Sequence, residues 1–124
     1  MPRDTPTYGP DTAKALARIQ TWIARGDTAD TLDLRGLDIH TVPPLPEDLR
    51  HFYCGNGPLA SIPALPPSLI SLTIWACDVA FLPTLPPNLN VIHCENIPLK
   101  EICGPFPTGL AYIQLPHRPI RIRT

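Results

Sequence analysis

A 20-residue repeat is the feature of this sequence that most limits how the chain can fold. The segment Leu65-Pro66-Pro67-Ser68-Leu69 recurs twenty residues later as Leu85-Pro86-Pro87-Asn88-Leu89, and Leu45-Pro46-Glu47-Asp48-Leu49 precedes it by the same interval. The period also aligns four apolar columns: Leu32, Phe52, Leu72, Ile92; Leu34, Cys54, Ile74, Cys94; Ile39, Leu59, Val79, Leu99; and Val42, Ile62, Leu82, Ile102. A fixed period of this length is typical of repeat architectures, in which each copy packs on its neighbours.

Each copy contains alternating apolar residues, which predict a short strand with its apolar side chains turned inward. We expect strands near residues 31–35, 51–55, 71–75 and 91–95, and another at 111–115 in a weaker fifth copy. A strand this short cannot bury its inner face alone, so the copies should stack about 4.8 Å apart. The predicted fold class is an α/β solenoid, a short leucine-rich-repeat coil with one parallel β-sheet.

Proline is the residue type whose abundance has to be explained. The chain has 18 prolines in 124 residues, about three times the usual share of ~5 %. They gather after each strand, as in Pro63-Ala64-Leu65-Pro66-Pro67. Polyproline-II backbone rises about 3.1 Å per residue without internal hydrogen bonds, so it spans the back of a thin coil in few residues. We therefore expect polyproline-II return limbs.

The segment before the repeats predicts a capping helix over residues 11–26. Pro10-Asp11-Thr12-Ala13 is typical of a capped helix start, and Gly26 of a helix end. Leu16, Ile19 and Ile23 form one apolar stripe, and this stripe should cover the open end of the core beside the first strand. Trp22 borders the stripe and should pack there too. The expected organisation is an N-terminal extension (1–10), this helix, and a solenoid of about five repeats (27–124).

The repeats resemble those of the leucine-rich-repeat effectors that bacterial pathogens inject into host cells. The resemblance is carried by the Leu-Pro-x-Leu-Pro-Pro limb, the preceding helix and Leu32-Asp33-Leu34-Arg35-Gly36-Leu37, and it covers roughly residues 11 to 115. It implies binding of host proteins. The ubiquitin-ligase domain of many members is not expected, because its Cys-x-Asp motif does not occur: Cys77 is followed directly by Asp78.

The turns depart from the family pattern. Family repeats place an asparagine three residues after the second strand leucine, where this chain has Leu37, Gly57, Cys77 and Ile97. Asn56 and Asn96 lie one residue earlier. Two explanations stay open: the hydrogen bonding of these turns differs from that of the family, or alternate copies pair in a 40-residue super-repeat. The second is suggested by the match of Cys54-Gly55-Asn56-Gly57-Pro58-Leu59 with Cys94-Glu95-Asn96-Ile97-Pro98-Leu99.

Charge and cysteine placement limit the function classes. A net charge of −1 gives no general attraction for phosphate backbones or anionic lipid, so we expect neither nucleic acid nor membrane as partner. Cys54 and Cys94 are two rungs apart, about 9–10 Å, which exceeds the ~7 Å limit between the α-carbons of a disulfide. We expect reduced cysteines and a cytoplasmic location or delivery into a host cytoplasm, because Met1-Pro2-Arg3-Asp4 lacks the pattern of a conventional signal peptide.

Catalysis and metal binding are not expected either. The four histidines, His40, His51, His93 and His117, fall in different columns or rungs, so no metal or other cofactor is predicted. The sequence shows no Ser-His-Asp arrangement, phosphate loop or paired carboxylates at catalytic spacing. We therefore predict a protein that is not an enzyme.

The concave sheet face is the predicted binding surface, because strand residues between the inward leucines point outward there. Exposed Trp and Tyr among hydrogen-bonding groups have the composition of an interface centre. The predicted partner-binding residues are Trp75, Tyr53, His93, Thr73, Arg35, Asp33, Glu95, His51, Tyr112 and Gln114. The leading hypothesis is an effector-like module that binds a partner protein, and the alternative is a structural subunit of a larger multiprotein assembly.

Overall fold

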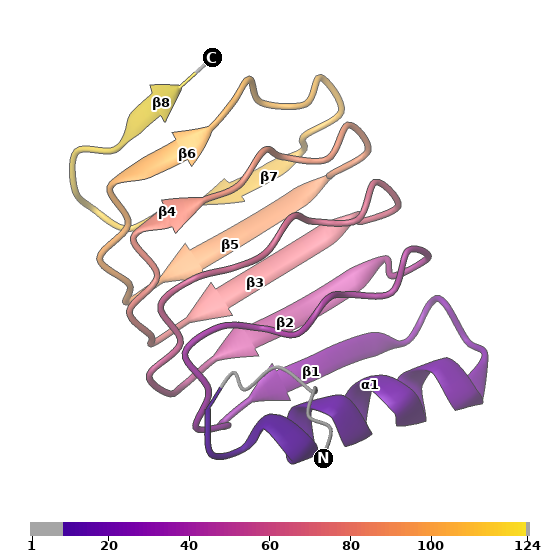
Figure 1. Ribbon diagram of the computed structural model, residues 1–124. Helices are drawn as coiled ribbons and strands as arrows, with labels where there is room; N and C mark the ends of the chain where they lie inside the picture. Colours follow the sequence, from indigo (N-terminus) through magenta and orange to yellow (C-terminus); the bar gives the residue numbers. More distant parts are fainter. Residues whose placement is uncertain (1–8, 124) are drawn as a thin grey trace.

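The computed structural model describes residues 9–123 as a stack of parallel rungs, each made of a strand, a turn and a return limb (Figure 1). Helix α1 (Thr12–Arg25) precedes the rungs, and the main strands are β1 (Thr31–Arg35), β2 (His51–Gly55), β3 (Ser71–Trp75), β5 (Val91–Glu95) and β7 (Tyr112–Gln114). They form one parallel sheet in the order β1-β2-β3-β5-β7. The register follows the repeat, since Leu32 pairs with Phe52, Phe52 with Leu72, and Leu72 with Ile92. The predicted parallel solenoid is confirmed.

A second sheet of three strands corrects the expectation of a single sheet. β4 (Phe81–Leu82), β6 (Glu101–Cys103) and β8 (Arg121–Arg123) pair in parallel in the order β4-β6-β8. Figure 1 shows them apart from the main strands, on the return side of the last rungs. Strands of two or three residues are too short for alternation to reveal, and they form because the repeat brings equivalent limb segments side by side.

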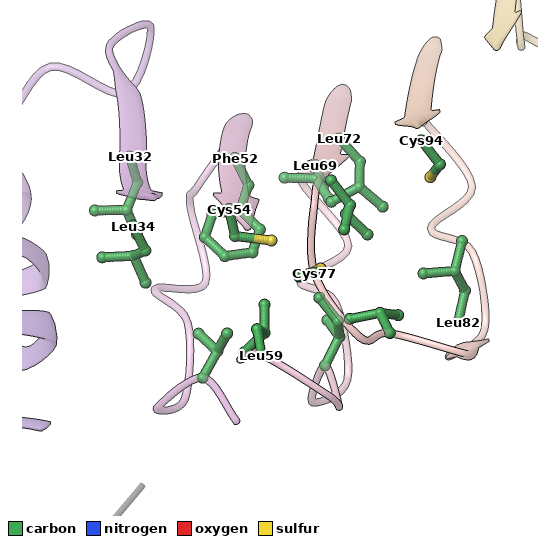
Figure 2. Close-up of a cluster of buried hydrophobic side chains, with 14 of the residues drawn as sticks. Leu32, Leu34, Phe52, Cys54, Leu59, Leu69, Leu72, Cys77, Leu82 and Cys94 are labelled. Atoms are coloured by element: carbon green, nitrogen blue, oxygen red, sulfur yellow. The ribbon is translucent and has the colours of Figure 1, made fainter. Parts of the chain in front are cut away.

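The apolar columns form the core between the main sheet and the return limbs. Leu72 and Ile74 in the middle rung are completely buried, as expected. Figure 2 shows such side chains, among them Leu32, Phe52 and Cys94, directed from successive rungs into the interior. The second leucine of each regular limb motif, at Leu49, Leu69 and Leu89, is completely buried as well. The first four rungs therefore share one continuous core, and the fifth rung adds only partly buried side chains such as Leu110 and Leu115.

The limb motif Leu-Pro-x-x-Leu has a local structural role. In the third copy of the motif the backbone N–H of Leu89 donates to the carbonyl of Pro86 (3.2 Å), and Leu69 and Pro66 make the same bond (3.1 Å). This i to i+3 bond closes a turn that leads the chain back into the next strand. The residues before it, such as 63–66 and 83–86, have no regular secondary structure.

A residue with left-handed backbone follows each of the first four main strands. Gly36, Asn56, Ala76 and Asn96 have φ angles of 74°, 56°, 54° and 57°. Glycine and asparagine adopt this region readily, whereas alanine has a steric cost there. The turn requirement therefore explains why Asn56 and Asn96 lie one residue before the family's asparagine position.

Helix α1 covers the N-terminal end of the stack as expected, but the face that it buries only partly matches the predicted stripe. Ile19 is buried with Ala15 and Trp22, whereas Ile23 is 51 % exposed. Ile19 and Trp22 pack on the core as expected, whereas Ala15 is buried in place of Ile23, so the buried face is rotated about the helix axis relative to the predicted stripe. Gly26 ends the helix in the left-handed conformation, as predicted.

Asp11 does not cap α1 with its side chain. Its Oδ2 atom accepts a hydrogen bond from the backbone N–H of Asp38 (2.8 Å), and its own N–H donates to the Asp38 carbonyl (3.1 Å). The hydrogen bond from the Asp38 N–H lowers the pKa of the Asp11 carboxyl. Asp11 therefore ties the helix start to the first turn of the solenoid. The predicted extension over residues 1–10 lies outside the described residues except for Gly9 and Pro10.

The last main strand is shorter than expected. β7 covers Tyr112–Gln114 instead of 111–115, and its inward residue Ile113 is 47 % exposed. Ile122 of β8 is also exposed. The predicted inward position of Ile113 does not give burial, because β7 is an edge strand and, within residues 9–123, no helix packs beside it as α1 packs beside the other edge strand, β1.

Candidate functional site

All ten predicted partner-binding residues lie on the outward side of the five-stranded sheet, called the sheet face below. Strand pairing arranges this face in three rows. The middle row is Asp33, Tyr53, Thr73, His93, Gln114; one flanking row is Arg35, Gly55, Trp75, Glu95; and the other is Thr31, His51, Ser71, Val91, Tyr112. Alternation along each strand thus places residues from five rungs on one surface.

A hollow of about 290 Å³ occupies the centre of the sheet face, lined by Tyr53, Thr73, Trp75, His93 and Glu95. We call it the central hollow. The Trp75 side chain is 41 % exposed, which makes it a large apolar surface open to solvent. His93 Nε2 lies 2.9 Å from Glu95 Oε1, so the imidazole and the carboxylate are joined by a hydrogen bond. Half of the predicted site residues therefore surround one concavity.

Gly55 determines the shape of this region. Its φ is 126°, and a Cβ atom there would lie 1.9 Å from the Trp75 carbonyl oxygen. The backbone of β3 therefore approaches β2 too closely for any side chain at residue 55. The missing side chain leaves the flanking row open between Arg35 and Trp75.

An ion pair lies beside the central hollow, on β1. Arg35 donates from Nε and Nη2 to Oδ1 and Oδ2 of Asp33, at 3.0 and 2.7 Å. Its Cζ atom also lies 3.9 Å from the ring centroid of Tyr53, a cation–π contact. The hydrogen bonds from Arg35 lower the pKa of Asp33, and those same bonds raise the pKa of Arg35. Arg35 is thus a fixed, paired cation.

The other predicted residues do not line the central hollow. His51 Nδ1 lies 2.8 Å from Ser71 Oγ in the flanking row that also contains Thr31, Val91 and Tyr112. Tyr112 makes an edge contact with His93, with ring centroids 6.2 Å apart and an interplanar angle of 70°. Gln114 is half-buried at the end of the middle row. These residues extend the surface on either side of the central hollow.

Arg18 of α1 borders the sheet face at the β1 edge, and the sequence analysis missed it. Its Nη1 atom donates to the carbonyls of Asp33 (3.2 Å) and Arg35 (2.9 Å), which satisfies acceptors on the free edge of β1. Together with Asn56 it also lines a second hollow of about 400 Å³ beside Arg35. A helix stripe of Ala15, Ile19 and Trp22 has Arg18 on its border, so the correct stripe would have indicated it.

The cysteines are free thiols, and three of the four, Cys54, Cys77 and Cys94, are buried. Burial raises the pKa of Cys54 well above its ordinary range and that of Cys94 to about 12. Such thiols are neutral packing groups at neutral pH.

Metal and membrane sites were also considered. Among residues 9–123, no three His, Cys, Asp or Glu side chains come together as a metal ion would require. The same part of the chain contains no helix long and apolar enough to span a bilayer.

Comparisons with known proteins support the fold. No family model and no curated protein matched the sequence. Among solved structures, the chain is similar to YopM from Yersinia enterocolitica WA-314, a leucine-rich-repeat bacterial effector, with a TM-score of 0.64 and 25 % sequence identity. The match covers 94 % of this chain and 33 % of YopM, so the chain spans about a third of that protein's length. The chain therefore folds as a leucine-rich-repeat solenoid similar to that of a bacterial effector, in agreement with the family resemblance of its repeats.

Proposed function

We propose that this protein is an effector-like binding module that holds a partner protein on its sheet face. The observation that carries the proposal is the central hollow, where an exposed Trp75 lies with Tyr53, His93 and Glu95 on three neighbouring strands. Tryptophan and tyrosine bury large areas with few rotatable bonds, which makes them common centres of protein interfaces. No catalytic step enters the proposal.

The size of the face limits the partner's contact area. Five strands about 4.8 Å apart give a strip of roughly 20 Å, so the contacted epitope is small. The net charge of −1 favours a protein over nucleic acid or an anionic membrane. We propose a location in the cytoplasm or, after delivery, in a host cytoplasm, and the similarity to YopM supports this proposal.

Capture from cell extract with matched variants tests the proposal. The immobilised wild-type chain, Trp75→Ala and Thr84→Ala are compared, because Thr84 is an exposed residue among the limb prolines (Pro83, Pro86, Pro87). A partner retained by wild type and Thr84→Ala but lost with Trp75→Ala supports the sheet face. A partner lost only with Thr84→Ala would place the interface on the return limbs.

Exposed apolar side chains at the β7 and β8 edge favour a second candidate, a structural subunit of an assembly. Tyr112, Ile113 and Ile122 are exposed there, and neighbouring subunits commonly cover such groups. Co-purification of a stoichiometric set of subunits, unaffected by Trp75→Ala, would support this candidate over the first.

A further inference from the structure

We infer that the central hollow receives an arginine side chain of the partner protein. The guanidinium would lie against the aromatic wall provided by Tyr53, Trp75 and His93, within reach of the Glu95 carboxylate. The inference rests on the proposed function and adds to it the chemical group that the sheet face recognises.

The aromatic lining favours a cation. A guanidinium over the face of Trp or Tyr is attracted by the negative potential of the ring, and Trp is the strongest of the aromatic side chains in this respect. Tyr53 already makes such a contact within the chain, with Arg35 at 3.9 Å. Arg35 comes from β1, whereas the central hollow lies toward β3, on the opposite side of β2. A second guanidinium can therefore approach without displacing Arg35.

The shape of the central hollow suits a flat group. In the middle row the small Thr73 separates Tyr53 from His93, so the two rings stand on strands about 9–10 Å apart. A group stacked between two rings needs about twice the stacking distance, and Arg35 on Tyr53 gives 3.9 Å for one such distance, so the space between the two strands is wide enough for one flat group. A planar guanidinium meets this requirement, whereas the ammonium of lysine is a compact charge without a stacking plane.

Charge also favours a cationic occupant. The Glu95 side chain is 56 % exposed, and its Oε1 takes part in the bond to His93. A carboxylate can accept about four hydrogen bonds, so it retains capacity for the N–H groups of a guanidinium. The nearby guanidinium of Arg35 is paired with Asp33, so it does not compete strongly with an incoming cation for the Glu95 carboxylate. An acidic partner segment would instead bring like charge against Glu95.

The test uses two blocked five-residue peptides, Gly-Ser-Arg-Ser-Gly and the same peptide with citrulline, the neutral isostere of arginine. Each is titrated into the ¹⁵N-labelled full chain. We expect the arginine peptide to shift the Trp75 indole N–H and the Thr73 and His93 amides in a saturable way, with Kd on the order of 1–10 mM. Citrulline should bind about tenfold more weakly. The Glu95→Gln variant should bind the arginine peptide less than about threefold more tightly than the citrulline peptide. The Thr84→Ala variant should bind both peptides as wild type does.

Equal binding of the arginine and citrulline peptides to the wild-type chain would overturn the inference. Chemical-shift changes confined to residues outside the central hollow would overturn it as well. The citrulline comparison needs no variant, so it decides the question even if Glu95→Gln misfolds. If the peptides fail while Trp75→Ala still releases the captured partner, the proposed function stands and only the arginine assignment is wrong. If Trp75→Ala has no effect on that partner, the sheet face itself is the wrong surface.

Discussion

Raising the pH above about 9 should destabilise this protein, because Cys54 and Cys94 are buried as neutral thiols. Burial raises their pKa values in the folded chain above the ordinary value of 9.0. Above pH 9 the unfolded chain releases these protons while the folded chain retains them. The stabilisation is therefore complete below the unfolded pKa and is lost as the pH rises toward the folded pKa.

The size of the effect follows from the shift. Each pH unit above 9 costs about 1.4 kcal/mol per thiol until the folded thiol ionises, which for Cys94 occurs at about 12. At about pH 10.5 Cys94 alone should reduce the free energy of unfolding by roughly 2 kcal/mol, and Cys54, whose pKa is raised in the same direction, adds to this loss. A domain of this kind has a stability of about 5–15 kcal/mol, so the loss is easy to measure.

Urea denaturation followed by circular dichroism from pH 7.5 to 10.5 measures the loss. The control is the double variant Cys54→Ala, Cys94→Ala, which starts from a lower stability but should show a much shallower pH slope. Some slope remains, because the pKa of Cys77 is also raised by burial. Equal slopes for wild type and the double variant would refute the reasoning.

Three further predictions concern the repeat. Leu72→Ala, in a completely buried site, should cost about 2–5 kcal/mol in urea denaturation, and a cost below about 0.5 would contradict the register. Gly55→Ala should cost about 3 kcal/mol or more, since its Cβ would meet the Trp75 carbonyl. The control Gly109→Ala places its Cβ in open space and should be nearly neutral, so similar melting temperatures for the two variants would disprove this. Ala76→Asn should gain about 0.5–1 kcal/mol by relieving a left-handed alanine, so a loss of stability would count against the turn geometry.

The main sheet was predictable because a period in the sequence becomes a period in space. Leu32, Phe52, Leu72 and Ile92 share one column in the sequence and one register in the sheet. Stacking identical rungs leaves little freedom, so locating one strand locates the others. The short strands β4, β6 and β8 were not predictable, because two or three residues carry no alternation and their pairing depends on neighbouring limbs.

The site was predictable in its placement but not in its contacts. Alternation put Tyr53, Trp75 and His93 on one face, and the structure brings them around one hollow. Alternation could not indicate that the Trp75 carbonyl leaves no room for a side chain at Gly55, because this depends on how closely the backbones of β2 and β3 approach. Nor could it indicate that Arg18 reaches the sheet, since that depends on the rotation of α1 about its axis.

The most direct test of the central claim is a titration of the captured partner, once purified, against wild type, Trp75→Ala and Thr84→Ala. Truncating an aromatic side chain at an interface centre commonly costs about 2 kcal/mol, so Trp75→Ala should raise Kd roughly thirtyfold. Its melting temperature should stay close to that of wild type, because the Trp75 side chain is 41 % exposed. Thr84→Ala should bind within about twofold of wild type. Wild-type affinity for Trp75→Ala together with weakened binding by Thr84→Ala would contradict the assignment of the sheet face.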